Sequence, residues 1–179
     1  MQMTPRGKML FMDTVRGENI GVKQLIQTRV RKVINNRYRD IENWRDIGDP
    51  SMANREQSDS TATAAQVIET ELKTTFEKGE KNWDSRREAL KEMFNRMVDG
   101  EPMFQLSRHD SVLHRCFRGG WHYSRDASGR VLRDKPVKDI HSHCGDAVSH
   151  GVGRLLMRPK VLDMLERIKR VNMERVRRT

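Results

Sequence analysis

The sequence has little cysteine, few aromatic residues and no long apolar run. Two of its 179 residues are cysteine, and aromatic residues make up 6%. Cys116 and Cys144 alone cannot build the disulfide framework of a small secreted domain, so a reducing cytoplasm is the expected compartment. No apolar run approaches the ~20 residues that span a bilayer, and no signal-peptide pattern follows Met1. We therefore expect no membrane partner.

Positive charge is abundant by contrast. Lysine and arginine number 35 against 25 acidic residues, which gives a formal net charge of +10. Such a balance favours a polyanionic partner such as nucleic acid, although a basic solvated surface would give the same count. The length suits one domain with its own core better than two full-sized ones.

The spacing of apolar residues predicts strands that alternate with helices. Strands are predicted at 8–15, 41–47, 74–76 and 103–106, with a hairpin whose arms are 121–123 and 130–132. Helices are predicted at 20–38, 61–72, from Ser85 to near Gly100, from Ser107 to Phe117 and at 139–157. This order indicates an α/β domain with a mixed sheet. Trp121 and Tyr123 are interpreted as core anchors of the hairpin rather than as base-stacking platforms.

Two aspartates are candidates for metal-assisted chemistry, because carboxylates that converge on divalent ions hydrolyse phosphodiesters. Asp49 follows a predicted strand in Gly48-Asp49-Pro50, and Asp146 lies in the first turns of a helix. Each has a simpler interpretation, as a turn residue or as compensation for a helix dipole. The face of that helix is polar at His143, Asp146, His150 and Arg154, which is unlike a core-packing face.

A zinc site is a weaker alternative at the same place. His141, His143 and Cys144 have side chains that ligate zinc, but no second ligand pair follows at finger-like spacing.

Four stretches, in this order, resemble the C-terminal nuclease domain of the large terminase subunit of tailed bacteriophages. They are GDPSMANREQSDSTATAAQVI (48–68), REALKEMFNRMVDGEPMF (87–104), FRGGWHY (117–123) and DKPVKDIHSHCGDAV (134–148). Each is weak alone, but together they cover most of the chain from Lys8 to Leu156.

The resemblance implies a fold, a site and a function in viral DNA packaging. The fold would be an RNase H-like mixed sheet flanked by helices at 1–157, followed by a basic C-terminal helix at 158–179. The activity would be a two-metal-type endonuclease, a hydrolase that cleaves double-stranded DNA with Mg²⁺ or Mn²⁺. Asp49 and Asp146 would be catalytic metal ligands, with His143 assisting beside them.

The partners implied by the resemblance are a separately encoded terminase ATPase half, the small terminase subunit and the portal, in the host cytoplasm. Arg55, Arg118, Arg167, Arg170 and Arg175 are expected to contact DNA phosphates without reading sequence. The last helix could equally be a solvated helix packed on the domain.

The sequence departs from the family at two points. No strand with a first catalytic aspartate precedes Lys8, and Asp13 is not assigned that role; the Gly-rich phosphate loop of the ATPase is also absent. The chain thus resembles a fragment, a split-gene product or a prophage remnant. A catalytically silent DNA-binding or assembly module is therefore the alternative function, and a resolvase- or transposase-type enzyme is a third.

Overall fold

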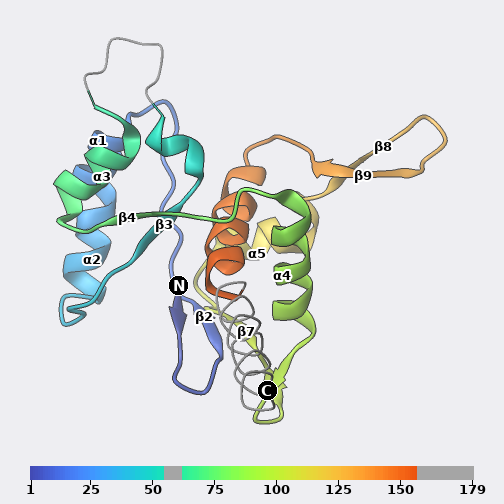
Figure 1. Ribbon diagram of the computed structural model, residues 1–179, viewed down its shortest axis with the longest axis horizontal. Coiled ribbons are helices and arrows are strands. Elements are labelled where there is room, and N and C mark those ends of the chain that lie inside the picture. The colour runs from blue at the N-terminus through green and yellow to red at the C-terminus, as the bar shows by residue number, and fades with distance from the viewer. Residues whose placement is uncertain (55–61, 157–179) are drawn as a thin grey trace, which may run out of the picture.

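The chain folds into an α/β structure whose strands are short. A computed structural model describes residues 1–54 and 62–156 (Figure 1). The α/β class predicted from the sequence is confirmed, and the strands of the described residues form four small sheets. The predicted basic helix at 158–179 lies outside the described residues.

The largest sheet is mixed and has three strands. It contains β1 (Gln2–Met3), antiparallel to β2 (Met9–Phe11), which in turn is parallel to β7 (Phe104–Leu106). A parallel pair consists of β3 (Asp46–Gly48) and β4 (Phe76–Lys78). Two antiparallel pairs are β5 (Met97–Val98) with β6 (Glu101–Pro102), and β8 (Tyr123–Arg125) with β9 (Val131–Pro136). Every predicted single strand exists, but it is shorter than predicted or shifted along the chain.

The helices follow the predicted apolar periodicity more closely. The first is continuous through α1 (Val22–Leu25), the π-helical turn η1 (Ile26–Val30) and α2 (Arg31–Arg37). The others are η2 (Pro50–Ala53), α3 (Ala64–Leu72), α4 (Trp83–Asn95), α5 (Ser111–Arg115) and the turn η3 (Cys116–Gly120). Residues 142–156 form a further helix. None of these described helices is long and apolar enough to cross a membrane.

Two predicted helix starts are wrong, in opposite directions. Asn82, and not Ser85, caps α4, because its side chain accepts a hydrogen bond from the Ser85 backbone N–H at 3.0 Å. Asp110, and not Ser107, caps α5 by accepting from the Leu113 N–H at 3.0 Å. In both regions several residues have side chains able to cap, so composition alone did not choose among them.

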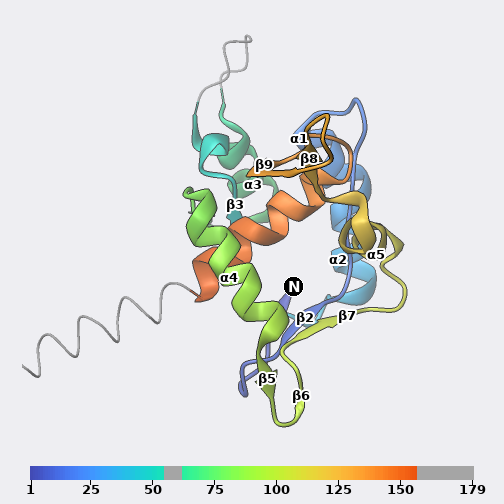
Figure 2. The same ribbon diagram turned by 90° about the vertical axis from the view of Figure 1, so that its right-hand side faces the viewer.

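The main core lies between α4, α5, the helix at 142–156 and the strand β2. Its most completely buried apolar side chains are Met9, Met93, Met103, Cys116 and Val152. Figure 2 shows α4 and the 142–156 helix crossing beside each other. Methionine side chains adapt to irregular gaps, which suits a core built from short, differently oriented elements.

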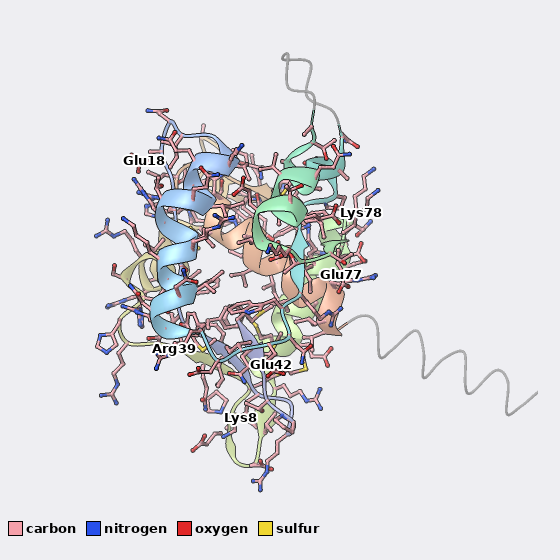
Figure 3. All side chains as sticks on the ribbon, turned by 90° about the vertical axis from the view of Figure 1, so that its left-hand side faces the viewer. Lys8, Glu18, Arg39, Glu42, Glu77 and Lys78 are labelled. Carbon is pink, nitrogen blue, oxygen red and sulfur yellow. The ribbon has the colours of Figure 1, made fainter. Side chains whose placement is uncertain are left out.

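The helix α1–α2 and helix α3 form a second group, seen side by side in Figure 3. Glu71 of α3 joins them, since its carboxylate accepts from Gln27 Nε2 at 3.0 Å and pairs with Arg31 Nη2 at 2.9 Å. The pair β3–β4 runs from this group toward the helix at 142–156 (Figure 1). The ends of these two strands therefore lie at the boundary between the two groups of helices.

Candidate functional site

A cleft of about 480 Å³ opens where the β3–β4 pair meets the 142–156 helix. One wall is apolar and comes largely from α1, η1 and α3, including Ile26 and Ile68. The polar lining residues include Asp49, Lys138, His143, Asp146 and His150. The structure thus places Asp49, His143 and Asp146, the three residues predicted to be catalytic, around one cavity.

Asp49 directly follows β3 and caps the short helix η2. Its Oδ1 accepts a hydrogen bond from the Ser51 N–H at 2.8 Å, and Pro50 supplies the first helical residue without a donor of its own. Burial acts to raise the pKa of Asp49, but the hydrogen bonds from Ser51 and the nearby His150 and Arg86 leave that pKa below its ordinary value. The side chain remains 51% exposed, so an ionised carboxylate faces the cleft.

His150 is the buried partner of Asp49, with a side chain only 5% exposed. Its Nδ1 lies 2.8 Å from the Glu80 carbonyl oxygen, which can only accept, so Nδ1 carries the proton. Burial, followed by the charge of Arg86, lowers the pKa of His150. The imidazole is therefore neutral near pH 7, with Nε2 as an acceptor 3.5 Å from Asp49 Oδ2.

A glycine permits this close approach between strand and helix. A Cβ on Gly79, just after β4, would lie 2.7 Å from His150 Cβ and 2.8 Å from the Gly48 carbonyl oxygen. The Gly79 N–H instead donates to that Gly48 oxygen at 2.8 Å. His150 and the end of β3 can therefore lie next to each other only because residue 79 has no side chain.

Asp146, with a side chain 17% exposed, is neutralised by cations of the chain itself. It forms an ion pair with Lys138 Nζ, and its Oδ1 lies 3.7 Å from Arg86 Nη1. The same Nη1 donates to Ser149 Oγ at 2.9 Å and lies 3.1 Å from His150 Nε2. Arg86 therefore connects the Asp146 side of the cleft to the His150–Asp49 side.

The three residues weighed as a zinc site lie in different surroundings. His143 is exposed and lines the cleft, Cys144 is buried in the core, and the ring of His141 lies close to Gly120. Among residues 1–54 and 62–156, no group of three or more His, Cys, Asp or Glu side chains is arranged to hold a metal ion.

The donor chemistry of the cleft nevertheless suits a hard divalent cation. Mg²⁺ is commonly held by one or two carboxylates and several waters, and Asp49 and Asp146 supply two carboxylates. Asp49 Oδ2 and His150 Nε2 are both acceptors at a separation of 3.5 Å, and a cation between them would relieve their repulsion. A cation binding Asp146 would have to displace Lys138.

One of the predicted DNA-contacting arginines belongs to the described residues. Arg118 is exposed on η3 and is not among the residues that line it. Arg55, Arg167, Arg170 and Arg175 lie outside the described residues. Asp13 accepts hydrogen bonds from Arg37 and Tyr38 and is not among the residues that line the cleft.

The sequence interpretation missed Lys138, which lines the cleft, and Arg86, which contacts Asp146 and His150 of the cleft. Arg86 precedes Ala89, Leu90 and Met93 at helical spacing, and all three are buried. An arginine on the apolar face of a helix is the signal that could have identified it, because buried guanidinium groups are rare unless they are paired.

Comparison of the chain with protein-family models, with curated proteins and with solved structures finds no match.

Proposed function

We propose that the chain is a terminase-type endonuclease domain with an RNase H-like fold, which cleaves double-stranded DNA with Mg²⁺ or Mn²⁺. One observation carries the proposal: Asp49 and Asp146, from distant parts of the sequence, line the same cleft and are connected through His150 and Arg86. The resemblance of the four sequence stretches to the terminase nuclease adds independent support.

The side chains of the cleft have distinct tasks in this proposal. A bound divalent ion would supply an activated water and neutralise charge on the phosphate. Asp49 and Asp146 would hold the ion through their carboxylates. The neutral Nε2 of His150 faces Arg86 Nη1 at 3.1 Å, and once Arg86 turned to the phosphate this nitrogen would orient a water beside Asp49 or accept a proton from it. His143, exposed at the same cleft, is placed to exchange a proton with the leaving oxygen.

Lys138 and Arg86 then bind the substrate. With Asp146 holding a metal ion, these two cations would lose part of their pairing and would be available to a DNA phosphate. An ATPase half, a small terminase subunit and a portal are the partners that the same proposal implies.

A catalytically silent DNA-binding or assembly module is the second candidate. Lys138 and Arg86 already neutralise Asp146, and the described residues contain no group of three metal-binding side chains. Both observations favour a cleft that is stable without metal.

Nicking of supercoiled plasmid separates the two candidates. We expect the purified chain to nick plasmid in Mg²⁺ or Mn²⁺, and Asp49→Asn and Asp146→Asn each to reduce the rate at least about 100-fold. Asp40→Asn is the matched control, since that carboxylate is 92% exposed and lies outside the cleft lining. A folded wild-type chain that does not nick would favour the silent module, and nicking by both cleft variants would exclude the cleft as the site.

A further inference from the structure

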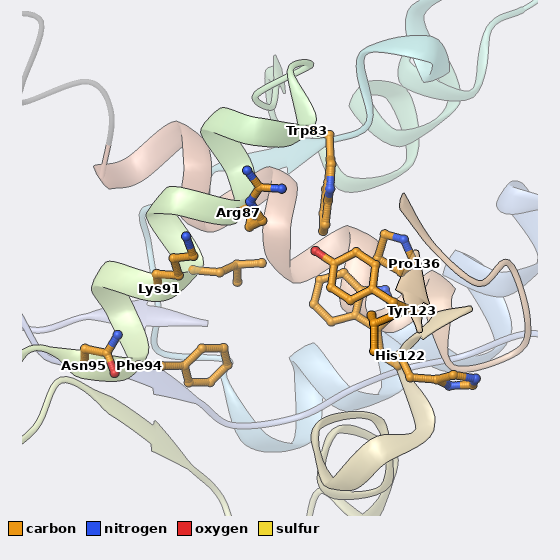
Figure 4. Close-up of a pocket in the computed structure, with 11 residues that line it drawn as sticks. Trp83, Arg87, Lys91, Phe94, Asn95, His122, Tyr123 and Pro136 are labelled. Carbon is orange, nitrogen blue, oxygen red and sulfur yellow. The ribbon is translucent and has the colours of Figure 1, made fainter. Parts of the chain in front are cut away.

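A second cavity, of about 650 Å³, lies between α4 and the β8–β9 hairpin (Figure 4). Its wall is rich in aromatic side chains: Trp83 and Phe94 from α4, with Trp121 and Tyr123 from the hairpin region. Trp83 is edge-to-face with Trp121 at 5.9 Å and with Tyr123 at 6.3 Å between ring centroids. Sites for small organic ligands have volumes of roughly 300–1,000 Å³, so the cavity is large enough for one planar ring system.

The polar groups of this wall include two cations, which pair with Asp84 and Glu88 outside the lining, and two unpaired donors. Arg87 and Lys91 line it, and none of its described lining residues is acidic. The indole N–H groups of Trp83 and Trp121 are buried and have no acceptor among the described residues. Buried indole N–H groups usually have an acceptor. Core packing alone does not explain why these two lack one, and a bound ligand could supply it.

A basic surface joins this cavity to the acidic cleft. It is an open depression whose charged lining residues are Glu80, Lys81, Asp84, Arg86, Arg87, Lys135 and Lys138. Five of these are cations and two are carboxylates. The depression shares Trp83 and Arg87 with the aromatic cavity, and Lys138 with the cleft.

The two lysines in the middle of this surface are available to a ligand. Lys81 and Lys135 are exposed, and neither pairs with a carboxylate of the described residues. Cations spaced along a groove follow the phosphates of a nucleic-acid strand, and aromatic side chains beside them stack on its bases. The basic surface adjoins the acidic cleft at one end and the aromatic cavity at the other, so one strand could contact all three.

We propose that the aromatic cavity binds an unpaired base of a DNA strand whose phosphates cross the basic surface to the acidic cleft. This inference rests on the proposed nuclease function and narrows its substrate: DNA that has unpaired nucleotides next to the cleavage position, as at a frayed end or a gap. A base inside a duplex is stacked on both faces and cannot enter. An apolar peptide fits less well, because it would leave the exposed Lys81 and Lys135 of the adjoining basic surface without anions.

Tryptophan fluorescence tests base binding directly. In a Trp44→Phe background, Trp83 and Trp121 are the only two tryptophans left. With EDTA present, so that no cleavage occurs, we expect single-stranded oligothymidylate to quench this fluorescence. A strand of the same length with abasic sugars carries the same phosphates without bases, and we expect it to bind about ten-fold more weakly and to quench little.

Two pairs of protein variants complete the test. Trp83→Ala should bind both strands equally weakly, whereas Trp44→Ala, which removes an exposed tryptophan outside the cavity lining, should keep the preference for bases. Lys81→Glu and Lys135→Glu should weaken binding and flatten its salt dependence more than Lys32→Glu, the same charge change on α2. Circular dichroism establishes that each variant is folded. The abasic strand changes the ligand instead of the protein, so it tests base binding by a cavity without substitutions.

Each outcome bears on the inference separately from the nuclease. Equal binding of the abasic and thymidylate strands, no binding of either, or quenching by an apolar peptide alone would overturn it. If the chain nicks plasmid but binds the thymidylate and abasic strands equally, the nuclease proposal stands and only base binding by the aromatic cavity is overturned. A preference for bases in a chain that never nicks would support base binding by the cavity and overturn the nuclease.

Discussion

At the scale of single residues, Arg86 has the largest influence on the acidic cleft. Its Nη1 lies within 3.7 Å of Asp146, within 3.1 Å of His150 and 2.9 Å from Ser149. A lysine could not replace it easily, because the planar guanidinium also stacks over the Trp83 ring at 5.1 Å. One side chain thus contacts both the cleft and a ring of the aromatic cavity.

Replacing Arg86 by glutamine should raise the pKa of His150. Burial is the larger cause of the lowered pKa and remains in the variant, but the charge of Arg86, the second cause, is removed. The pKa can be followed through the imidazole C–H signals in an NMR pH titration. Arg87→Gln is the control, because Arg87 pairs with Asp84 and has no recorded contact with His150. An unchanged pKa in Arg86→Gln would mean that burial alone sets it.

The two thiols should be unreactive in the folded protein. Burial raises the pKa of Cys116 to about 12 and also raises the pKa of Cys144. Only a thiolate attacks a disulfide reagent quickly, so we expect both cysteines to react slowly with Ellman's reagent at mildly alkaline pH and rapidly in guanidinium chloride. Fast release of one thiol equivalent from the native chain would contradict this burial.

The sequence identified residues with a local signature and missed those without one. Asp49 was recognisable from its Gly-Asp-Pro turn, and Asp146 from a polar helix face. Arg86 contacts Asp146, Ser149 and His150 of a helix far away in sequence, whereas Lys138 pairs with Asp146 at a sequence separation of 8. No pattern around Lys138 predicts that it pairs with Asp146, because that geometry depends on how the chain enters the 142–156 helix.

At the scale of elements, the junction of β4 with the 142–156 helix limits what residue 79 can be. Gly79→Ala would bring a Cβ to 2.7 Å from His150 Cβ and 2.8 Å from the Gly48 carbonyl oxygen. Neither atom is at the end of a flexible side chain, so neither can move away easily. We expect a loss of roughly 1–3 kcal/mol in the free energy of unfolding, measured by urea denaturation.

Gly21→Ala is the matched control for this prediction. Gly21 has φ −70°, and a Cβ there would meet nothing within 4 Å. Its replacement should cost less than that of Gly79, because the weaker capping by alanine at this helix N-cap is partly offset by the lower conformational freedom of the unfolded chain. Equal effects of the two substitutions would show that the junction is not tightly packed.

Helices were predicted better than strands for a physical reason. An amphipathic helix such as α3 is specified by its own apolar period and by the capping box between Thr63 and Gln66. The extent of β2 depends instead on its partner β7, which pairs with it only from Met9 to Phe11. The predicted strand at 8–15 was therefore too long, because sequence periodicity does not say where a partner strand ends.

At the scale of the whole molecule, acid should weaken the connection between the two groups of helices. Glu77 of β4 accepts two hydrogen bonds from Arg45, both of 2.7 Å, and its Oε2 lies 3.6 Å from Arg154. The bonds from Arg45 are the main cause of a pKa below the ordinary value of 4.5. Because that pKa is lowered in the folded state, the stabilisation is present above 4.5 and is lost as pH falls through the lowered value.

Glu77→Gln should therefore remove roughly 1 kcal/mol of stability at neutral pH and very little in strong acid. The measurement is the free energy of unfolding against pH for wild type and variant. Glu42→Gln, at an exposed position with no ion pair among the described residues, is the control and should leave the curve unchanged. Parallel curves for wild type and Glu77→Gln would show that this carboxylate has no special role in acid unfolding.

The sequence predicted the α/β class of the molecule more readily than its sheet arrangement. Alternating apolar patterns indicated an α/β chain, and this is confirmed. That the described strands form small separate sheets depends on pairings such as Asp46 with Phe76, which are contacts between distant segments and leave no local trace. The RNase H-like fold remains a proposal that rests on the resemblance.

The junction of β4 with the 142–156 helix also affects when the cleft can form. The hydrogen bond from His150 to the Glu80 carbonyl joins residues 70 positions apart in the sequence, and the bond from Arg86 to Ser149 joins residues 63 positions apart. Contacts between such distant segments form slowly compared with helices. During synthesis on the ribosome, Asp49 and β3 emerge long before the helix that carries Asp146, so the acidic cleft is assembled only when nearly all of the described chain has been made.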